Sequence, residues 1–241
     1  MARLPETEAK KFAEEFERAT PKEVLHWAGE KFKGKIALAS SFGLEDVVLI
    51  DLIAKSGADI RVFTIDTGRL HQETYTLMER LGEKYSIPVE IFFPDTAAVE
   101  AMVNEKGINL FYSSSEARVE CCHVRKVEPL RRALAPLDAW VTGLRREQAP
   151  TRSGIAKVEI DHVNGGLVKV NPLADWTGDQ ILAYIKQNDV PYNPLLDQGY
   201  VSIGCAACTR PIRKGENPRK GRWWWEDDAK KECGLHLNFS K

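Results

Sequence analysis

Short apolar runs alternate with longer stretches of helical periodicity between residues 36 and 142. Continuous apolar runs of this length are typical of strands buried on both faces of a sheet. Strands separated by helices must pair in parallel, because a crossover helix returns the chain to the same edge. We therefore predict an α/β fold in which a parallel twisted sheet carries helices on both faces. The predicted strands are 36–39, 60–65, 89–93 and 139–142, and the predicted helices are 44–55, 70–85, one from Asp95 and 114–135.

The flanking segments follow other patterns. The sequence Thr20-Pro21-Lys22-Glu23 is typical of a capping box with proline at the first helical position, so a helix starts there. Two strand-like runs around Asn164-Gly165-Gly166 predict a hairpin. Amphipathic helices are expected over 6–18 and 179–187. We predict a nucleotide-binding α/β domain over 1–190 and a loop-rich segment over 191–241, which completes a cluster site and ends in a mobile tail.

Composition excludes several classes of protein. The chain has 241 residues, of which 43% are hydrophobic and 29% charged, with a formal net charge of −1. This balance provides a core but no global field for nucleic acid or an anionic membrane. The longest apolar runs, such as Val47-Val48-Leu49-Ile50, are far shorter than a membrane span, and the N-terminus has no signal-peptide core. We expect a cytoplasmic protein without a nucleic-acid or membrane partner.

Three loops follow predicted strands, where parallel sheets bind their ligands. Ser40–Gly43 joins a strand to a helix, and its amides and hydroxyls could face an anion or simply cap the helix. Asp66–Arg69 could contact a ribose or phosphate, or form only a tight turn. The loop at 143–148 carries Arg145 and Arg146, whose guanidinium groups suit phosphate or sulfate unless both are merely solvated.

Four of the five cysteines form two pairs, Cys121-Cys122 and Cys205-Ala206-Ala207-Cys208. Four thiolates are the number that a tetrahedral zinc ion or an iron–sulfur cluster requires. Zinc ribbons separate both members of each pair, so the adjacent cysteines favour a cluster. Two disulfides or four buried thiols remain alternatives, although nothing in the sequence indicates an oxidising compartment.

The C-terminal region combines a lone cysteine with cations and aromatic residues. Cys233 has Lys230, Lys231 and His236 nearby in sequence, and cations favour a reactive thiolate. An incidental thiol is the alternative. Arg219, Lys220, Arg222 and the tryptophans at 223–225 suggest a lid that closes on a charged nucleotide and carries Cys233, or aromatic packing alone.

These motifs together resemble the adenylyl-sulfate and phosphoadenylyl-sulfate reductase family, in particular its iron–sulfur branch of bacterial assimilatory enzymes. The resemblance rests on both cysteine pairs and on Glu232-Cys233-Gly234-Leu235-His236. The segments Ser40–Asp46, Asp66–Tyr75 and Gly143–Arg152 also resemble the family's nucleotide loops, so the match runs from about residue 35 to 237. It implies a fold of the adenine nucleotide alpha hydrolase type.

The resemblance implies a chemistry as well. Cys233 would attack the sulfur of adenylyl sulfate, AMP would leave, and thioredoxin or glutaredoxin would then release sulfite. It also implies a homo-oligomer and one [4Fe–4S] cluster. Lys126 lies four residues after Cys122, so we expect the cluster to position this lysine and not to change redox state. The implied cluster ligands are Cys121, Cys122, Cys205 and Cys208, and the implied substrate-binding residues are Ser40, Ser41, Gly43, Lys126, Arg145, Arg219, Arg222 and His236.

Three alternatives stay open at this point. The Ser-Ser-Phe-Gly loop at 40–43 is similar to that of the phosphoadenylyl branch, so phosphoadenylyl sulfate could replace or join adenylyl sulfate as substrate. A tRNA-modifying ATP pyrophosphatase would require a Ser-Gly-Gly-x-Asp-Ser loop, which is absent. A non-catalytic iron–sulfur redox sensor would leave the nucleotide loops and Cys233 without a role.

Overall fold

The structure is a computed structural model that describes residues 4–213 and 215–226. The chain divides into two compact units. The first comprises Met1–Thr64, Thr76–Glu90 and Leu134–Tyr192, and the second comprises Ile65–Tyr75, Ile91–Ala133 and Asn193–Lys241. Each unit therefore draws on three stretches of chain. The predicted boundary between 190 and 191 stays a prediction.

A six-stranded sheet forms the centre of the fold, with strand order β3-β2-β1-β4-β6-β5. β1 pairs in parallel with β2 and β4, and β4 pairs in parallel with β6. β5 runs antiparallel to β6, with which it forms a hairpin. The predicted α/β fold with a mainly parallel sheet is confirmed. The strands are β1 (Ile36–Ala39), β2 (Arg61–Ile65), β3 (Val89–Phe92), β4 (Ala139–Val141), β5 (Val158–Asp161) and β6 (Leu167–Val170).

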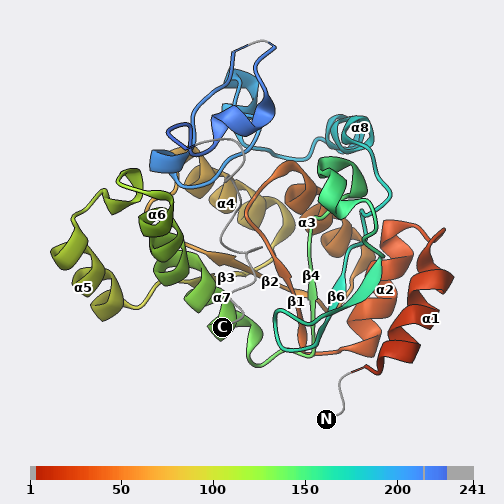
Figure 1. The fold of residues 1–241 in the computed structure, drawn as a ribbon. Coiled ribbons are helices and arrows are strands. Elements are labelled where there is room, and N and C mark those ends of the chain that lie inside the picture. The colour runs from red at the N-terminus through yellow and green to blue at the C-terminus, as the bar shows by residue number, and fades with distance from the viewer. Residues whose placement is uncertain (1–3, 214, 227–241) are drawn as a thin grey trace. The chain divides into compact units, whose positions relative to one another are not determined.

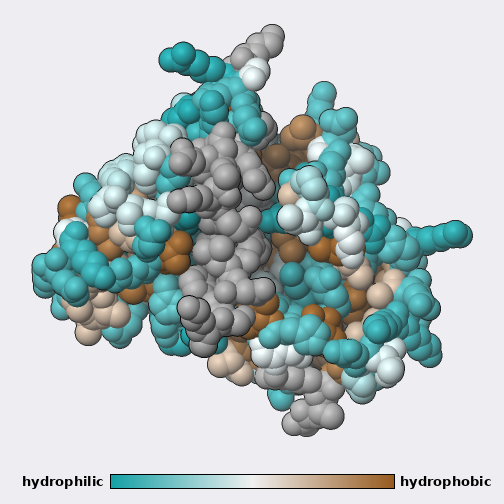
Figure 2. Space-filling model, in the orientation of Figure 1, coloured by the Kyte–Doolittle hydropathy of each residue, from teal (hydrophilic) through white to brown (hydrophobic). Residues whose placement is uncertain are grey.

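One apolar core holds the first unit together. It joins buried residues of the sheet to those of the surrounding helices, and Ile36, Leu38, Val62 and Val141 are fully buried within it. Burial on both faces explains why these strands read as continuous apolar runs. Hydrophilic residues predominate on the surface visible in Figure 2. The helices that supply this core are α1 (Glu6–Phe16), α2 (Pro21–Lys31), α3 (Leu44–Ser56), α4 (Gln72–Tyr85) and α8 (Gly178–Asn188).

Local signals place the helix ends as predicted. The Thr20 side chain accepts a hydrogen bond from the Glu23 amide while the Glu23 carboxylate accepts one from the Thr20 amide, which completes the capping box of α2. Gly57 ends α3 with a φ of 65°, a left-handed conformation that glycine adopts without strain. Gly165 and Gly166 also have positive φ between β5 and β6, which confirms the hairpin turn.

The second unit contains the main departure from the predicted elements. We expected one helix over 114–135, but the structure has α6 (Ser115–Cys122), a π-helical turn η2 (His123–Val127) and α7 (Glu128–Leu134). In η2 the Glu128 amide donates to the carbonyl of His123, five residues back. Such π turns are rare and frequent at functional sites. The other regular elements of this unit are α5 (Thr96–Lys106) and the 3-10 turns η1 (Leu110–Tyr112), η5 (Pro194–Gln198), η6 (Ala206–Cys208) and η7 (Pro218–Gly221).

The segment after Asp189 is loop-rich, as predicted, over its described part. Within 191–213 and 215–226 the only regular elements are 3-10 turns and the single bridge between Thr209 and Arg222. The predicted mobile tail with Cys233 falls outside the described residues. No helix in the described part of the chain has the length and apolar character that crossing a membrane requires.

Candidate functional site

The first candidate site is the loop between β1 and α3 in the first unit. Phe42 adopts a φ of 60° although it is not glycine, and its side chain is buried. A bulky residue in the left-handed region is unusual and is tolerated where the surroundings hold it. Its amide donates to the Ser40 hydroxyl oxygen at 3.1 Å, and the Ser40 amide donates to the carbonyl of Phe63 in β2. The loop is therefore held in one strained conformation by its neighbours.

A buried carboxylate organises this loop. Asp46, in the first turn of α3, accepts hydrogen bonds from the Ser41 amide at 2.6 Å and from the Ser41 hydroxyl at 2.9 Å. Burial raises the pKa of Asp46 to about 6, against the lowering effect of these bonds. The positive end of α3 thus already has an internal anion. Contact of Ser40, Ser41 and Gly43 with the substrate stays a prediction.

The loop after β4 approaches α3 closely at Gly143. A Cβ atom at this position would lie 2.6 Å from Asp46 Oδ1 and 2.8 Å from the Cβ of Glu45. No side chain fits in this space, so glycine is required by the close approach. Two of the three predicted ligand loops, those of 40–43 and 143–148, therefore meet at the carboxyl ends of adjacent strands.

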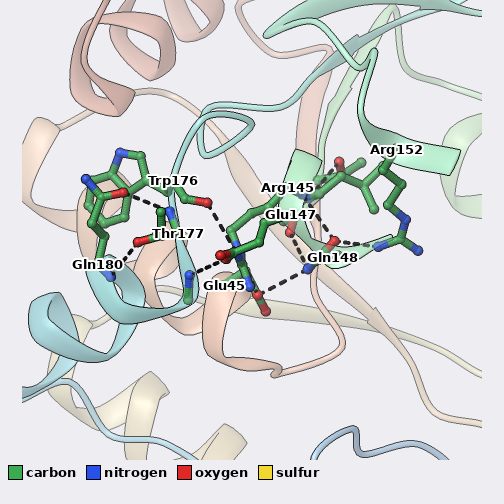
Figure 3. A network of polar contacts seen from close by, with 12 residues as sticks. Glu45, Arg145, Glu147, Gln148, Arg152, Trp176, Thr177 and Gln180 are labelled. Atoms are coloured by element: carbon green, nitrogen blue, oxygen red, sulfur yellow. Dashed lines mark hydrogen bonds and ion pairs between the residues drawn. The ribbon is translucent and has the colours of Figure 1, made fainter. Parts of the chain in front are cut away.

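Arg145 lies in a dense polar network at this edge (Figure 3). Its Nε donates to Glu45 at 2.8 Å, and one terminal nitrogen donates to Glu147 at 2.8 Å and to the Trp176 carbonyl at 3.2 Å. Glu147 in turn accepts from the Gly178 amide at the start of α8, and this bond is the main reason that its pKa is lowered. Arg145 thereby ties α3, the β4 loop and α8 together. Direct contact of Arg145 with the substrate stays a prediction.

The second candidate site is a cavity in the second unit that contains about 310 Å³ of empty space, part of it continuous with solvent. Both cysteine pairs line it, as the sequence predicted for a shared site. The other lining residues are mostly cationic. The cavity is lined by Cys121, Cys122, Cys205, Cys208, Phe111, Arg69, Arg118, Arg125 and Lys126.

The π turn η2 follows the two adjacent cysteines directly. Cys121 and Cys122 end α6 immediately before this turn, which contains Lys126. Both cysteines and Lys126 line the cavity. The positioning of Lys126 by a cluster stays a prediction.

The loop at 66–69 contributes to this second site. The Thr67 hydroxyl lies 3.2 Å from the Cys205 sulfur, and the Ala206 amide donates to the Arg69 carbonyl at 2.8 Å. Arg125 donates to the Thr67 carbonyl at 2.7 Å. This loop therefore supports the Cys205 turn, which is a contact that the sequence did not indicate.

Two thiols of the cavity, Cys121 and Cys208, are in an environment that disfavours their charged form when no metal is bound. Burial first, and then the neighbouring Cys122, raises the pKa of Cys121 to about 11, and Arg125 and Arg69 oppose this shift. Burial and then Cys205 raise the pKa of Cys208 to about 12, and Arg222 and Lys126 oppose this shift.

Several buried N–H groups of the second unit have no hydrogen-bond acceptor within the residues that the structure describes. They are Arg222 Nε, Trp223 Nε1 and Trp225 Nε1. Trp223 belongs to the same apolar cluster as Cys121 and Cys208, and Trp225 packs against it. Unpaired buried donors are costly in a protein without a ligand. They fit a region that accepts a negatively charged group.

The remaining predicted residues have mixed outcomes. Arg222 stacks over Trp223 at 4.7 Å, and one of its terminal nitrogens donates to the Ser202 hydroxyl. Cys233 and His236 lie outside the described residues, and the side chain of Arg219 is not described. Three lining residues, Phe111, Arg118 and Arg125, were missed. The spacing of the two arginines offered a signal, since each lies four residues from a paired cysteine.

The fold and the two sites define an α/β protein with nucleotide-type loops and a cation-lined tetrad of cysteines. Residues 35–211 match the profile of the family described as phosphoadenosine phosphosulfate reductase domain, so the chain belongs to that family. It is 52% identical over 203 residues to adenosine 5'-phosphosulfate reductase of Burkholderia cepacia, a match that covers 84% of this chain and 81% of the relative.

Solved structures agree with this assignment. A phosphoadenylyl-sulfate reductase from Candida auris in a phosphate complex superposes with a TM-score of 0.76 at 31% identity, covering 87% of this chain and 99% of that one. An FMN adenylyltransferase from Candida glabrata shares the fold alone, with a TM-score of 0.57 at 17% identity and coverage of 88% and 75%. The predicted adenine nucleotide alpha hydrolase-like fold is confirmed.

Replacement of Gly143 by alanine tests the close approach of the two loops. The added methyl group must displace Asp46 or the first turn of α3, so Gly143→Ala should lower the free energy of unfolding by about 1–3 kcal/mol. Gly82→Ala is the matched control, because no atom lies within 4 Å of its Cβ position in α4. The control should be neutral or stabilising by up to about 1 kcal/mol. Chemical denaturation measures both, and equal stability of the two variants would refute the steric constraint.

The raised pKa of Asp46 predicts a pH effect on stability. Its folded-state pKa of about 6 exceeds its ordinary value of 3.8, so the folded protein holds an extra proton between these values. The stabilisation of the folded state by this proton is fully present below pH 4 and is lost as the pH rises through about 6. Relative to Asp46→Asn, the wild type should lose about 3 kcal/mol of unfolding free energy over this range. Denaturant titrations at pH 4 and pH 7.5 measure it.

Asp138→Asn is the control, since Asp138 forms a partly exposed pair with Lys35. Because the pair is partly exposed, the difference in unfolding free energy between the wild type and Asp138→Asn should change by less than about 1 kcal/mol over this pH range. A constant difference between the wild type and Asp46→Asn across this pH range would contradict the interpretation of Asp46.

Proposed function

We propose that the protein is a thiol-dependent reductase that converts adenylyl sulfate to sulfite and AMP in assimilatory sulfate reduction. The observation that carries this proposal is the convergence of both cysteine pairs on one cavity lined by cations, in a chain closely similar to an adenosine 5'-phosphosulfate reductase. An ATP pyrophosphatase would not need the four cysteines of the cavity, and a redox sensor would not need Cys233. Neither alternative explains why the chain belongs to this family.

The cysteine tetrad is proposed to hold one [4Fe–4S] cluster. In the described part of the chain, no group of three Cys, His, Asp or Glu side chains is placed to hold a metal ion. The four thiols that line one cavity match in number the four thiolate ligands that a [4Fe–4S] cluster requires. The orphaned N–H donors and the lining cations suit the negative charge of such a group.

The bound cluster would hold the chain around Lys126 in place, and the chain's own residues would supply the chemistry. Arg125 and Lys126 are held on the cavity wall by α6 and η2, where cations can neutralise a sulfate or phosphate group. We propose that Lys126, Arg219, Arg222 and His236 hold the phosphosulfate. The loops at 40–43 and 143–148 would hold the nucleotide.

The proposed reaction has two transfers. The Cys233 thiolate attacks the sulfonyl sulfur, the new S–S bond forms, the S–O bond breaks and AMP leaves with the electron pair. A thioredoxin thiolate then attacks the Cys233 sulfur and displaces sulfite, and a second thioredoxin thiol resolves the mixed disulfide. Thioredoxin is thus oxidised by two electrons as the sulfur is reduced. Glutaredoxin could serve in the same role, and either donor fits a reducing, cytoplasmic location. A homo-oligomer is part of the proposal.

Phosphoadenylyl sulfate is the second candidate substrate. The observation that favours it is the similarity to the Candida auris phosphoadenylyl-sulfate reductase over most of this chain. That relative is 31% identical, against 52% for the Burkholderia cepacia enzyme, so adenylyl sulfate is the first choice.

Sulfite release by anaerobically purified protein with reduced thioredoxin tests the proposal. Adenylyl sulfate should be turned over with a kcat/KM at least tenfold above that for phosphoadenylyl sulfate. Cys233→Ser should abolish sulfite formation, because no nucleophile remains for the first transfer. Comparable rates with both substrates would indicate a dual-substrate enzyme, and no sulfite from either would refute the proposed activity.

Iron and sulfide analysis tests the cluster. Cys205→Ser should lose iron, acid-labile sulfide and visible absorbance, because one of four ligands is removed. Cys233→Ser is the matched control, since it is the same substitution at a cysteine outside the tetrad. It should retain iron and sulfide at the wild-type level. Equal iron loss in both variants, or none in either, would contradict the assignment of ligands.

A further inference from the structure

A buried ion pair in the second unit has no role in the reaction described above. Arg118 of α6 donates from Nε to Glu226 Oε1 at 2.6 Å and from a terminal nitrogen to Glu226 Oε2 at 3.1 Å. The two side chains are only 2% and 3% exposed. A two-point contact between a guanidinium and a carboxylate fixes orientation as well as distance.

Arg118 has further partners on the side of the cysteine cavity. Its guanidinium lies over the Trp223 ring at 4.5 Å. Arg118 also lines the cavity together with Cys122, the last residue of the same helix. One side chain therefore connects the cavity of the proposed cluster ligands to the chain segment at 223–226.

Stability alone does not explain such a pair. Apolar residues of similar volume often replace a buried ion pair at no cost, whereas removal of one partner leaves an uncompensated charge. A bidentate pair is instead suited to hold a segment in one orientation. Here the held segment is the last one before Cys233, which follows Glu226 by seven residues. Seven extended residues span at most about 25 Å, so an anchor at Glu226 limits the space that Cys233 can reach.

We propose that Arg118 and Glu226 are positioning residues that anchor the segment carrying Cys233 to the helix of the proposed cluster ligands. This inference rests on the proposed function, in which the Cys233 thiolate must meet the substrate sulfur. The anchor fixes the point from which the chain continues toward Cys233, at most seven residues from that thiolate. Neither residue takes part in bond making.

The test uses full-length, cluster-loaded protein and two variants. Glu226→Gln places an N–H₂ group against the Arg118 donors, and Arg118→Met/Glu226→Met removes both charges while keeping a packed interior. Quenched-flow mass spectrometry measures single-turnover sulfonation of Cys233 by adenylyl sulfate without reductant. Glu226→Gln, which keeps Arg118, should retain wild-type iron content, and both variants should bind adenylyl sulfate as the wild type does but lose about twofold or more in rate. A general loss of folding would lower iron content and binding as well.

Hydrogen exchange provides a readout that does not depend on catalysis. Amides of 222–226 should exchange faster in both variants, while those of α5 stay unchanged. Glu128→Gln is the matched control, because it makes the same change in an exposed pair with Arg132. It should alter neither exchange nor rate.

The outcomes separate the two proposals. Wild-type rates in both variants, or unchanged exchange at 222–226, would overturn the anchor. If wild-type Cys233 took no sulfonate, the proposed function would fail instead. The exchange data would then still show whether Arg118 and Glu226 anchor the segment. The proposed role of the anchor in sulfonyl transfer would be refuted together with the proposed function.

Discussion

The second unit depends on the electrostatic balance between cysteine side chains and surrounding cations. Four thiolates in one largely buried cavity would repel one another and lose hydration, and burial is the largest cause of the raised pKa of Cys121 and Cys208. The arginines and the lysine of the cavity wall offset this repulsion. A cationic wall therefore has two effects, since it favours the thiolate form of Cys121 and Cys208 and attracts anions to the cavity.

The geometry of the cavity requires contacts between distant parts of the chain. Thr67 and Cys205 are 138 residues apart in sequence and 3.2 Å apart in space, and Arg118 and Glu226 are separated by 108 residues. Only the tertiary fold brings these groups together. The π turn η2 adds a local adjustment, because it sets Lys126 on the same wall as the adjacent cysteines.

Sequence patterns predicted the features that local chemistry determines. Buried strands such as β1 are continuous apolar runs, and the capping box at Thr20 and Glu23 depends only on residues three apart. The cysteine pairs indicated a shared site because paired thiols are typical of metal and cluster ligands, and all four line one cavity. The break in the helix at His123 was not predictable, since the apolar residues Val124 and Val127 continue a helical pattern through it. The burial of Arg118 depends on Glu226, 108 residues away, and a local pattern carries no information about such a partner.

Sequence patterns also did not predict what the polar side chains of the loops at 40–43 and 143–148 contact. Arginines at the end of a strand suggest anion binding, yet Arg145 has its Nε and one terminal nitrogen committed to protein acceptors at 2.8–3.2 Å. Ser41 likewise directs its amide and hydroxyl to Asp46. These groups fix the shape of the loops, and substrate contact by either residue would require an exchange of partners. The backbone that they hold in place, strained at Phe42 and closely packed at Gly143, is already shaped before any nucleotide arrives, which lowers the ordering cost of binding.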